Sequence, residues 1–325
     1  MPTYRRVQDI DHEIGPRGAL SLAVTSADVR LTATAGASAH VRATFEIGAA
    51  SDQEADEAFE TLRLSVHAGD GTLAVDEPDG HRGLGGAISR LLGGGRTAEL
   101  YGVEVEAPAG CRLEVRVVSS DVQASGFSGA QHFQSVSGDL RLVDTGGDLD
   151  IDSVSGDVSL RASAPVSLTM NNVSGDLSAQ APTFEHLRIQ SVSGDVSVDG
   201  ALSPVTPHGV DTVSGDFRLA SGSGITVSVR GMSSDIHSAL PHRLEGSADR
   251  RRLVLGDGAA SVAFNSMSGD LAVTQSRQRP GPAEASVASA PSTTPLADKR
   301  NEILGALERG EIDVDEAMRR LGDRA

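Results

Sequence analysis

The chain is poor in aromatic and in basic side chains. Its 325 residues include seven Phe, two Tyr and no Trp, so platforms on which nucleic-acid bases could stack are hard to build. The 28 Lys and Arg residues are outnumbered by 45 Asp and Glu, which gives a formal net charge of −17. Because affinity for nucleic acids depends largely on neutralising phosphates, we expect no nucleic-acid partner.

Cysteines and long apolar runs are also scarce. Cys111 is the only cysteine, which excludes an intrachain disulfide and a thiolate metal cluster. No apolar run approaches the about 18 residues of a membrane-spanning helix, so we expect no transmembrane segment. The N-terminal sequence MPTYRRVQDIDHEIG lacks the apolar stretch of a signal peptide. Together these absences predict a cytoplasmic location.

Glycine, by contrast, is abundant, with 37 residues, and it recurs in a repeated Ser-Gly-Asp motif that reads Ser-Ser-Asp in two copies. The aspartates are separated by 18, 18, 19, 19, 21, 19 and 35 residues, and they are Asp121, Asp139, Asp157, Asp176, Asp195, Asp216, Asp235 and Asp270. A period of about 20 residues is typical of solenoids, in which each repeat forms one coil. The last spacing is nearly two periods, so we expect one coil without the motif.

Three apolar positions recur around each aspartate. The first lies three residues before it, at Val118, Val136, Val154, Val173, Val192, Val213, Met232 and Met267. The second follows the aspartate directly, and the third lies three residues after it in most repeats, as Leu140 and Leu142 do for Asp139. Alternation after the aspartate predicts a short strand with one buried face. Because one coil cannot bury that face alone, we expect stacked coils with all three apolar rows inside and the aspartates at one corner.

The predicted fold class is therefore all-β: a β-solenoid with 18–21 residues per coil, followed by a short C-terminal α-helical hairpin. A capping box at Ser51 and Glu54 predicts a short helix near residues 52–62, and a glycine-rich stretch predicts a mobile loop at 78–99. The predicted parts are an N-terminal arm at 1–17, an irregular β-rich part at 18–110, the solenoid at 111–275, a proline-rich disordered linker at 276–295 and the helical hairpin at 296–325.

The Ser-Gly-Asp series, the strand–helix–strand start and the Val-Glu-Ala-Pro-Ala-Gly segment at 105–110 resemble the DUF4097 family over roughly residues 18–275. Members of this family are bacterial β-strand-repeat proteins that carry the provisional label of adhesin, and some relatives occur in envelope-stress systems. Residues 296–322 resemble the SHOCT-like helical hairpin. The resemblance implies a β-repeat protein and supplies no catalytic residue.

The strongest candidate site is the row of aspartates Asp139, Asp157, Asp176, Asp195 and Asp216. We favour the interpretation that each carboxylate accepts backbone N–H groups of its own turn. The alternative is Ca²⁺ binding along the row, because hard cations prefer clustered oxygens. The sequence contains no nucleophile elbow and no phosphate-binding loop, so we expect no catalytic residues and no cofactor.

The function predicted from these features is that of a non-enzymatic scaffold or protein-interaction protein. A hairpin of about 30 residues has little stability alone, so we expect it to attach the solenoid to a protein partner or to a second copy. In the other interpretation the hairpin folds back and covers the unpaired edge of the last coil. Two further functions stay open: a ligand-sensing or Ca²⁺-binding module, and a polysaccharide-processing enzyme with paired acids and aromatic platforms in a groove.

Overall fold

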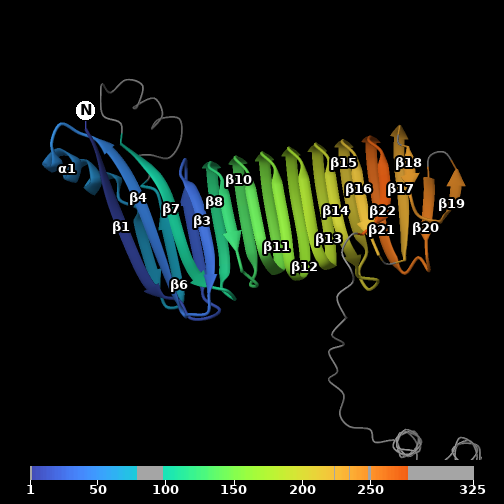
Figure 1. Ribbon diagram of the computed structural model, residues 1–325, viewed down its shortest axis with the longest axis horizontal. Helices are drawn as coiled ribbons and strands as arrows, with labels where there is room; N and C mark the ends of the chain where they lie inside the picture. The colour runs from blue at the N-terminus through green and yellow to red at the C-terminus, as the bar shows by residue number, and fades with distance from the viewer. Residues whose placement is uncertain (1, 79–97, 223, 234, 248–249, 277–325) are drawn as a thin grey trace, which may run out of the picture. The chain divides into compact units, whose positions relative to one another are not determined.

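The computed structural model of the protein describes residues 2–78, 98–222, 224–233, 235–247 and 250–276, which form twenty-two strands and one helix (Figure 1). The chain divides into two units, Met1–Gly281 and Pro282–Ala325, and the described residues all belong to the first. Beyond Ser276, the predicted linker and hairpin lie outside the described residues. No helix in the described ranges has the length and apolar character needed to cross a bilayer.

The central coils are stacked in parallel and in register. In each coil one strand segment runs into the Ser-Gly-Asp turn and a second leaves it, and we call these two sets of segments the first and the second layer. Leu149 pairs with Leu168 in the first layer, and Leu142 pairs with Leu160 in the second. The strands of these coils are β8 (Arg112–Ser119), β9 (Val122–Ser125), β10 (Gln131–Ser137), β11 (Leu140–Ser155), β12 (Val158–Ser174), β13 (Leu177–Ser193), β14 (Val196–Leu202), β15 (His208–Ser214) and β16 (Phe217–Ser221).

The glycine of the turn motif is required by its backbone. Gly156 and Gly175 have φ angles of 118° and 120°, which side chains with a Cβ rarely adopt. A Cβ at Gly156 would also lie 2.2 Å from the carbonyl oxygen of Gly138 in the neighbouring coil. The motif therefore fixes both the shape of each turn and the close stacking of one turn on the next.

The last coil in the sequence is not the last coil in space. Strands β21 (Ala260–Ser268) and β22 (Leu271–Gln275) lie between the coil of β15 and β16 and the coil of β17 (Ile225–Ser233) and β18 (Ile236–Ser238) (Figure 1). The long spacing before Asp270 holds the antiparallel strands β19 (His242–Ser247) and β20 (Arg250–Leu255), which extend the first layer beyond β17. The expectation of one coil without the turn motif is therefore wrong, because the extra residues form a hairpin at the end of the stack.

The N-terminal end of the stack is also out of sequence order. Strands β2 (Ala19–Val24) and β3 (Asp28–Thr34) form a coil on β8 and β9, and β6 (Thr72–Asp76) and β7 (Ala98–Pro108) lie on its other side. Beyond them, β5 (Ser65–Gly69) pairs with β6, and β4 (Ser38–Gly48) pairs with β7. The outermost strand of the second layer is β1 (Thr3–Glu13), which lies within the predicted N-terminal arm.

The predicted short helix is confirmed as α1 (Asp52–Leu62). The Glu54 N–H donates to Ser51 Oγ over 3.2 Å, and the Glu54 carboxylate accepts the N–H of Ala50 over 3.0 Å. The first bond satisfies a donor that the first helical turn leaves free, and the second ties the residue before the N-cap to the helix. Most of the loop predicted at 78–99 lies outside the described residues.

The core lies between the two layers, and one expected core row is outside it. The rows that follow the aspartates are buried, as the expectation required, with Leu140, Leu142 and Leu160 among them. The row that precedes them is on the outer surface, with side chains 44–58% exposed at Val118, Val136, Val154, Val173, Val192, Val213 and Met267. The prediction that this row is buried is therefore wrong.

Strand alternation explains the error. In β11 the side chain of Ile151 is buried, Asp152 is outside, Ser153 is buried, and Val154 is outside again. The inward position nearest the turn holds a small polar residue in the neighbouring coils too, namely Asn172, Ser191, Thr212 and Ser266. Because side chains on a strand alternate strictly, a buried serine forces the valine after it to face solvent.

Candidate functional site

The turn aspartates form a continuous hydrogen-bonded row along one edge of the stack, which we call the turn edge. Each Oδ1 accepts the backbone N–H of the aspartate in the next coil over 2.8–3.0 Å, in the spatial order Asp121, Asp139, Asp157, Asp176, Asp195, Asp216, Asp270 and Asp235. The carboxylates do accept backbone N–H groups, but from the neighbouring coil and not from their own turn. They therefore fasten one coil to the next.

One more aspartate, which the sequence did not reveal, lies in line with the row by its backbone position. Val29 N–H donates to Asp121 O over 2.9 Å, just as Val122 N–H donates to Asp139 O over 2.9 Å. Asp28 therefore occupies the same place in its coil as Asp121 does. Its motif, Ser-Ala-Asp-Val at 26–29, lacks the glycine and lies far upstream of the other repeats.

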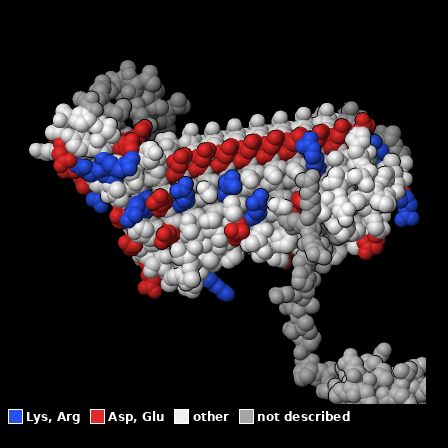
Figure 2. Space-filling model, in the orientation of Figure 1, with Lys and Arg blue, Asp and Glu red and all other residues white. Residues whose placement is uncertain are grey.

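The turn edge is strongly acidic. Figure 2 shows a red stripe of carboxylates along one edge of the coils, with a basic group near one end. Among the Lys and Arg side chains that the structure describes, only Arg218 pairs with the row: it lies 2.8 Å from Asp195 Oδ2 and 3.5 Å from Asp216 Oδ2. The backbone N–H of Asp216, and then the Arg218 guanidinium, lower the pKa of Asp195 because both stabilise its charged form.

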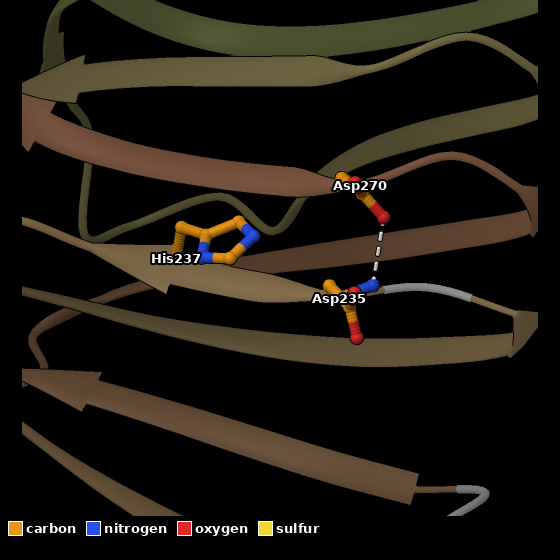
Figure 3. A group of neighbouring side chains, drawn as sticks. All are labelled: Asp235, His237 and Asp270. Atoms are coloured by element: carbon orange, nitrogen blue, oxygen red, sulfur yellow. Dashed lines mark hydrogen bonds between the residues drawn. The ribbon is translucent and has the colours of Figure 1, made fainter.

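A candidate metal-binding group lies at the far end of the row (Figure 3). Ligand atoms of Asp235, His237 and Asp270 all lie within 4.8 Å of one another, and Asp270 Oδ1 also accepts the N–H of Asp235 over 2.8 Å. Sequence spacing missed this group because Asp270 meets β18 only through the displaced last coil. None of the five aspartates proposed for Ca²⁺ belongs to such a group of three in the described chain.

The exposed valine row forms one wall of a groove of about 730 Å³ that crosses six coils. The polar row two residues before the valines lines the same groove, at Gln134, Asp152, Asn171, Gln190 and Asp211. Hydrogen bonds order parts of this polar row: Asn171 Nδ2 donates to Asp152 Oδ1 over 2.8 Å, and Arg116 Nε donates to Gln134 Oε1 over 3.1 Å. The groove thus combines a regular apolar wall with an ordered polar wall.

A second hollow, of about 680 Å³, lies over the second layer near the N-terminal end of the stack. Tyr101 lines it, and the Arg5 guanidinium lies 5.6 Å from the centre of the Tyr101 ring. Carboxylates and guanidinium groups both line it, from Asp28, Arg30, Glu104, Asp121, Asp139 and Arg141. Its mixed charge contrasts with the apolar wall of the valine groove.

Comparisons with known proteins found a matching family model and several similar solved structures. The family model described as Toastrack DUF4097 matches residues 97–185 and 147–249, which supports the resemblance drawn from the Ser-Gly-Asp series. No curated protein matches the chain in sequence.

Several solved structures are similar to part of the chain. One from Parabacteroides distasonis, provisionally named a lipid-binding protein, has 9% identity and a TM-score of 0.40, and the match covers 83% of this chain and 97% of that one. Another, from Parabacteroides merdae and provisionally named an adhesin, has 10% identity and a TM-score of 0.39 with the same coverage. A third, from Bacteroides fragilis with the same provisional name, has 11% identity and a TM-score of 0.35, covering 82% and 97%.

Proposed function

We propose that the protein is a non-enzymatic interaction protein whose turn edge is its docking surface. The observation that carries this proposal is the row of seven exposed apolar side chains, one per coil, at the same place in successive coils. Contiguous exposed apolar surface on a folded protein is typical of an interaction site. Stacked coils hold such a row rigidly, with neighbours about 4.8 Å apart, so little conformational freedom is lost when a partner binds.

The C-terminal residues 296–325 complete the proposal as the attachment or oligomerising element. Strand β22 starts at the turn edge and ends at the opposite edge, where the N–H of Ser276 donates to Ser221 O over 3.4 Å and its Oγ donates to Asp199 Oδ1 over 2.5 Å. The chain therefore leaves the solenoid on the edge away from the valine row. Attachment at that edge would keep the docking surface free.

The competing interpretation, in which the hairpin covers the last coil, loses part of its basis. Strand β21 pairs with β15 and β17, and β22 pairs with β16 and β18, so the last coil in the sequence has no unpaired edge. A cap would have to act at the end formed by β18 and β19 instead. The proposed cytoplasmic location is compatible with either arrangement.

Light scattering on the full chain and on two shortened chains tests the attachment. The full chain should be larger than a monomer, and a chain ending at Ser276, which keeps every described strand, should be a folded monomer. A control chain ending at Pro295 keeps the linker and should also be monomeric. A monomeric full chain whose shortened form aggregates would contradict the attachment and favour the cap.

A further inference from the structure

The groove beside the valine row cannot be filled by adding a strand to the sheet. Strands β11, β12 and β13 pair on both sides with their neighbours, so their backbone groups are already used. An occupant lying along the groove must therefore satisfy its own backbone hydrogen bonds, which an α-helix does. Six coils at about 4.8 Å span about 24 Å, the length of a helix of about 16 residues.

The apolar wall suits the face of such a helix. One valine side chain per coil lines the groove, and each is about half exposed: Val136, Val154, Val173, Val192 and Val213. Their spacing of about 4.8 Å is close to the 5.4 Å between successive turns of a helix, so apolar side chains at every third or fourth position can meet them in turn.

Charge selects the helix that fits. Beyond the valine row, three residues further along each coil, lies the aspartate row, and the opposite wall of the groove contains Asp152 and Asp211. Of the residues lining the groove, Arg116 at one end is the only cation. Carboxylates on both sides of the groove attract a helix that has Lys and Arg beside its apolar stripe. The same carboxylates repel an acidic helix.

The same charge argues against other occupants. Residues 296–325 contain six Lys and Arg against eight Asp and Glu, a net charge of −2, so the chain's own C-terminal segment is not complementary. A second copy would bring an identical aspartate row, and a surface of anionic lipid would be repelled. We propose that the groove binds a basic amphipathic α-helix of a partner protein. This proposal rests on the proposed function and adds the chemistry of the partner to it.

Peptide binding to the full-length protein tests the proposal. The probe is a fluorescent Leu/Lys peptide of about 16 residues with leucines at helical spacing. One control has the same composition in an order without that spacing, and another replaces every Lys by Glu. In fluorescence anisotropy we expect the Leu/Lys helix to bind at least about tenfold more tightly than either control, with affinity that falls as salt rises.

Variants locate the site. Val154→Ser, Val173→Ser and Val192→Ser together should weaken binding by about tenfold or more. The matched control changes the outer face of the second layer in the same three coils, Ser159→Ala, Ser178→Ala and Ser197→Ala, and should leave binding unchanged. In the double variant Asp157→Asn with Asp176→Asn, the amide oxygen of each asparagine can still accept the N–H of the next coil, but two negative charges are lost. Binding should therefore weaken more at low salt than at high salt.

Crosslinking distinguishes a partner helix from the other candidate occupants of the groove, which are the chain's own C-terminal segment and a second copy. Cys111 is fully buried, and burial raises the pKa of its thiol to about 11, so a cysteine introduced by Val173→Cys can carry a photocrosslinker selectively. The crosslink should form to the Leu/Lys peptide. A crosslink to residues 277–325 or to a second copy, equal binding of all peptides, or no binding at all would overturn the helix proposal. Those results would leave the light-scattering test of the interaction function unaffected.

Discussion

From Asp121 to Asp270 in the stack, each aspartate of the row uses one carboxylate oxygen to accept a backbone N–H of the next coil. Asp195 shows a division between its two oxygens: Oδ1 accepts the N–H of Asp216 over 3.0 Å, while Oδ2 meets Arg218 over 2.8 Å. The hydrogen bond holds the next turn in place, and the second oxygen keeps the charge at the edge. The repeated residue therefore contributes to stacking and to surface charge at once.

This division predicts a pH effect at Asp195. Its pKa in the folded protein lies below the usual value because the Asp216 N–H and Arg218 favour the charged form. A depressed folded pKa stabilises the fold above the unfolded value of about 3.9, and the contribution is lost as pH falls through the folded pKa. The stability difference between the protein and Asp195→Asn, measured by urea unfolding, should therefore shrink below about pH 4. A difference that is constant from neutral to acid pH would contradict this account.

Within a coil, burial depends on which face of the strand a residue occupies and not on its apolarity alone. Leu160 is 2% exposed in the second layer, whereas Val154, six residues earlier in the same coil, is 47% exposed. Leu160→Asp buries an unpaired charge and should destabilise the fold by about 3–5 kcal/mol. Val154→Asp places its charge in water and should change stability by less than about 1 kcal/mol. Thermal melts of the two variants compare the two positions. An equal fall in melting temperature would contradict the assignment of Leu160 to the core and Val154 to the surface.

The sequence was sufficient to predict the second layer because its strands alternate between apolar and polar residues after every aspartate. It failed in the first layer because the inward position before the turn holds Ser153, Asn172 or Ser191, while the outward position holds valine. At these two positions the polar residue is the buried one and the apolar residue is the exposed one. That reversal also marks the candidate docking surface, since an apolar side chain kept outside in seven successive coils contributes nothing to the core.

At the scale of the whole molecule, the aspartate row gathers the carboxylates of successive coils at one surface, where dissolved cations could meet them. If its carboxylates serve only to accept N–H groups and to attract a basic partner, millimolar Ca²⁺ should barely change the melting temperature. A rise of many degrees would mean that the native state binds the ion, because a ligand of the folded state stabilises it by mass action. Asp270→Asn, which alters the group of Asp235 and His237, separates binding at that end from binding along the row.

The order of the coils could not be predicted from the repeats. Every turn offers the same carboxylate and the same N–H, so the Asp270 coil fits against Asp216 as well as the Asp235 coil would. Only the long-range pairings select one order, and periodicity contains no information about them. The Asp28 coil was missed because its turn sequence lacks the glycine and lies outside the periodic series.

This order makes the C-terminal end of the stack interdependent. In a solenoid built in sequence order, removing the last coil would leave all earlier coils in place. Here β21 and β22 connect β17 and β18 to the rest of the stack, so a chain ending at Gly258 should lose the structure of residues 225–255 as well. Hydrogen exchange should show fast exchange in β17 and β20 of the shortened chain, with β11 and β12 still protected. Protection of β17 equal to that in the full chain would show that this segment is held without the inserted coil.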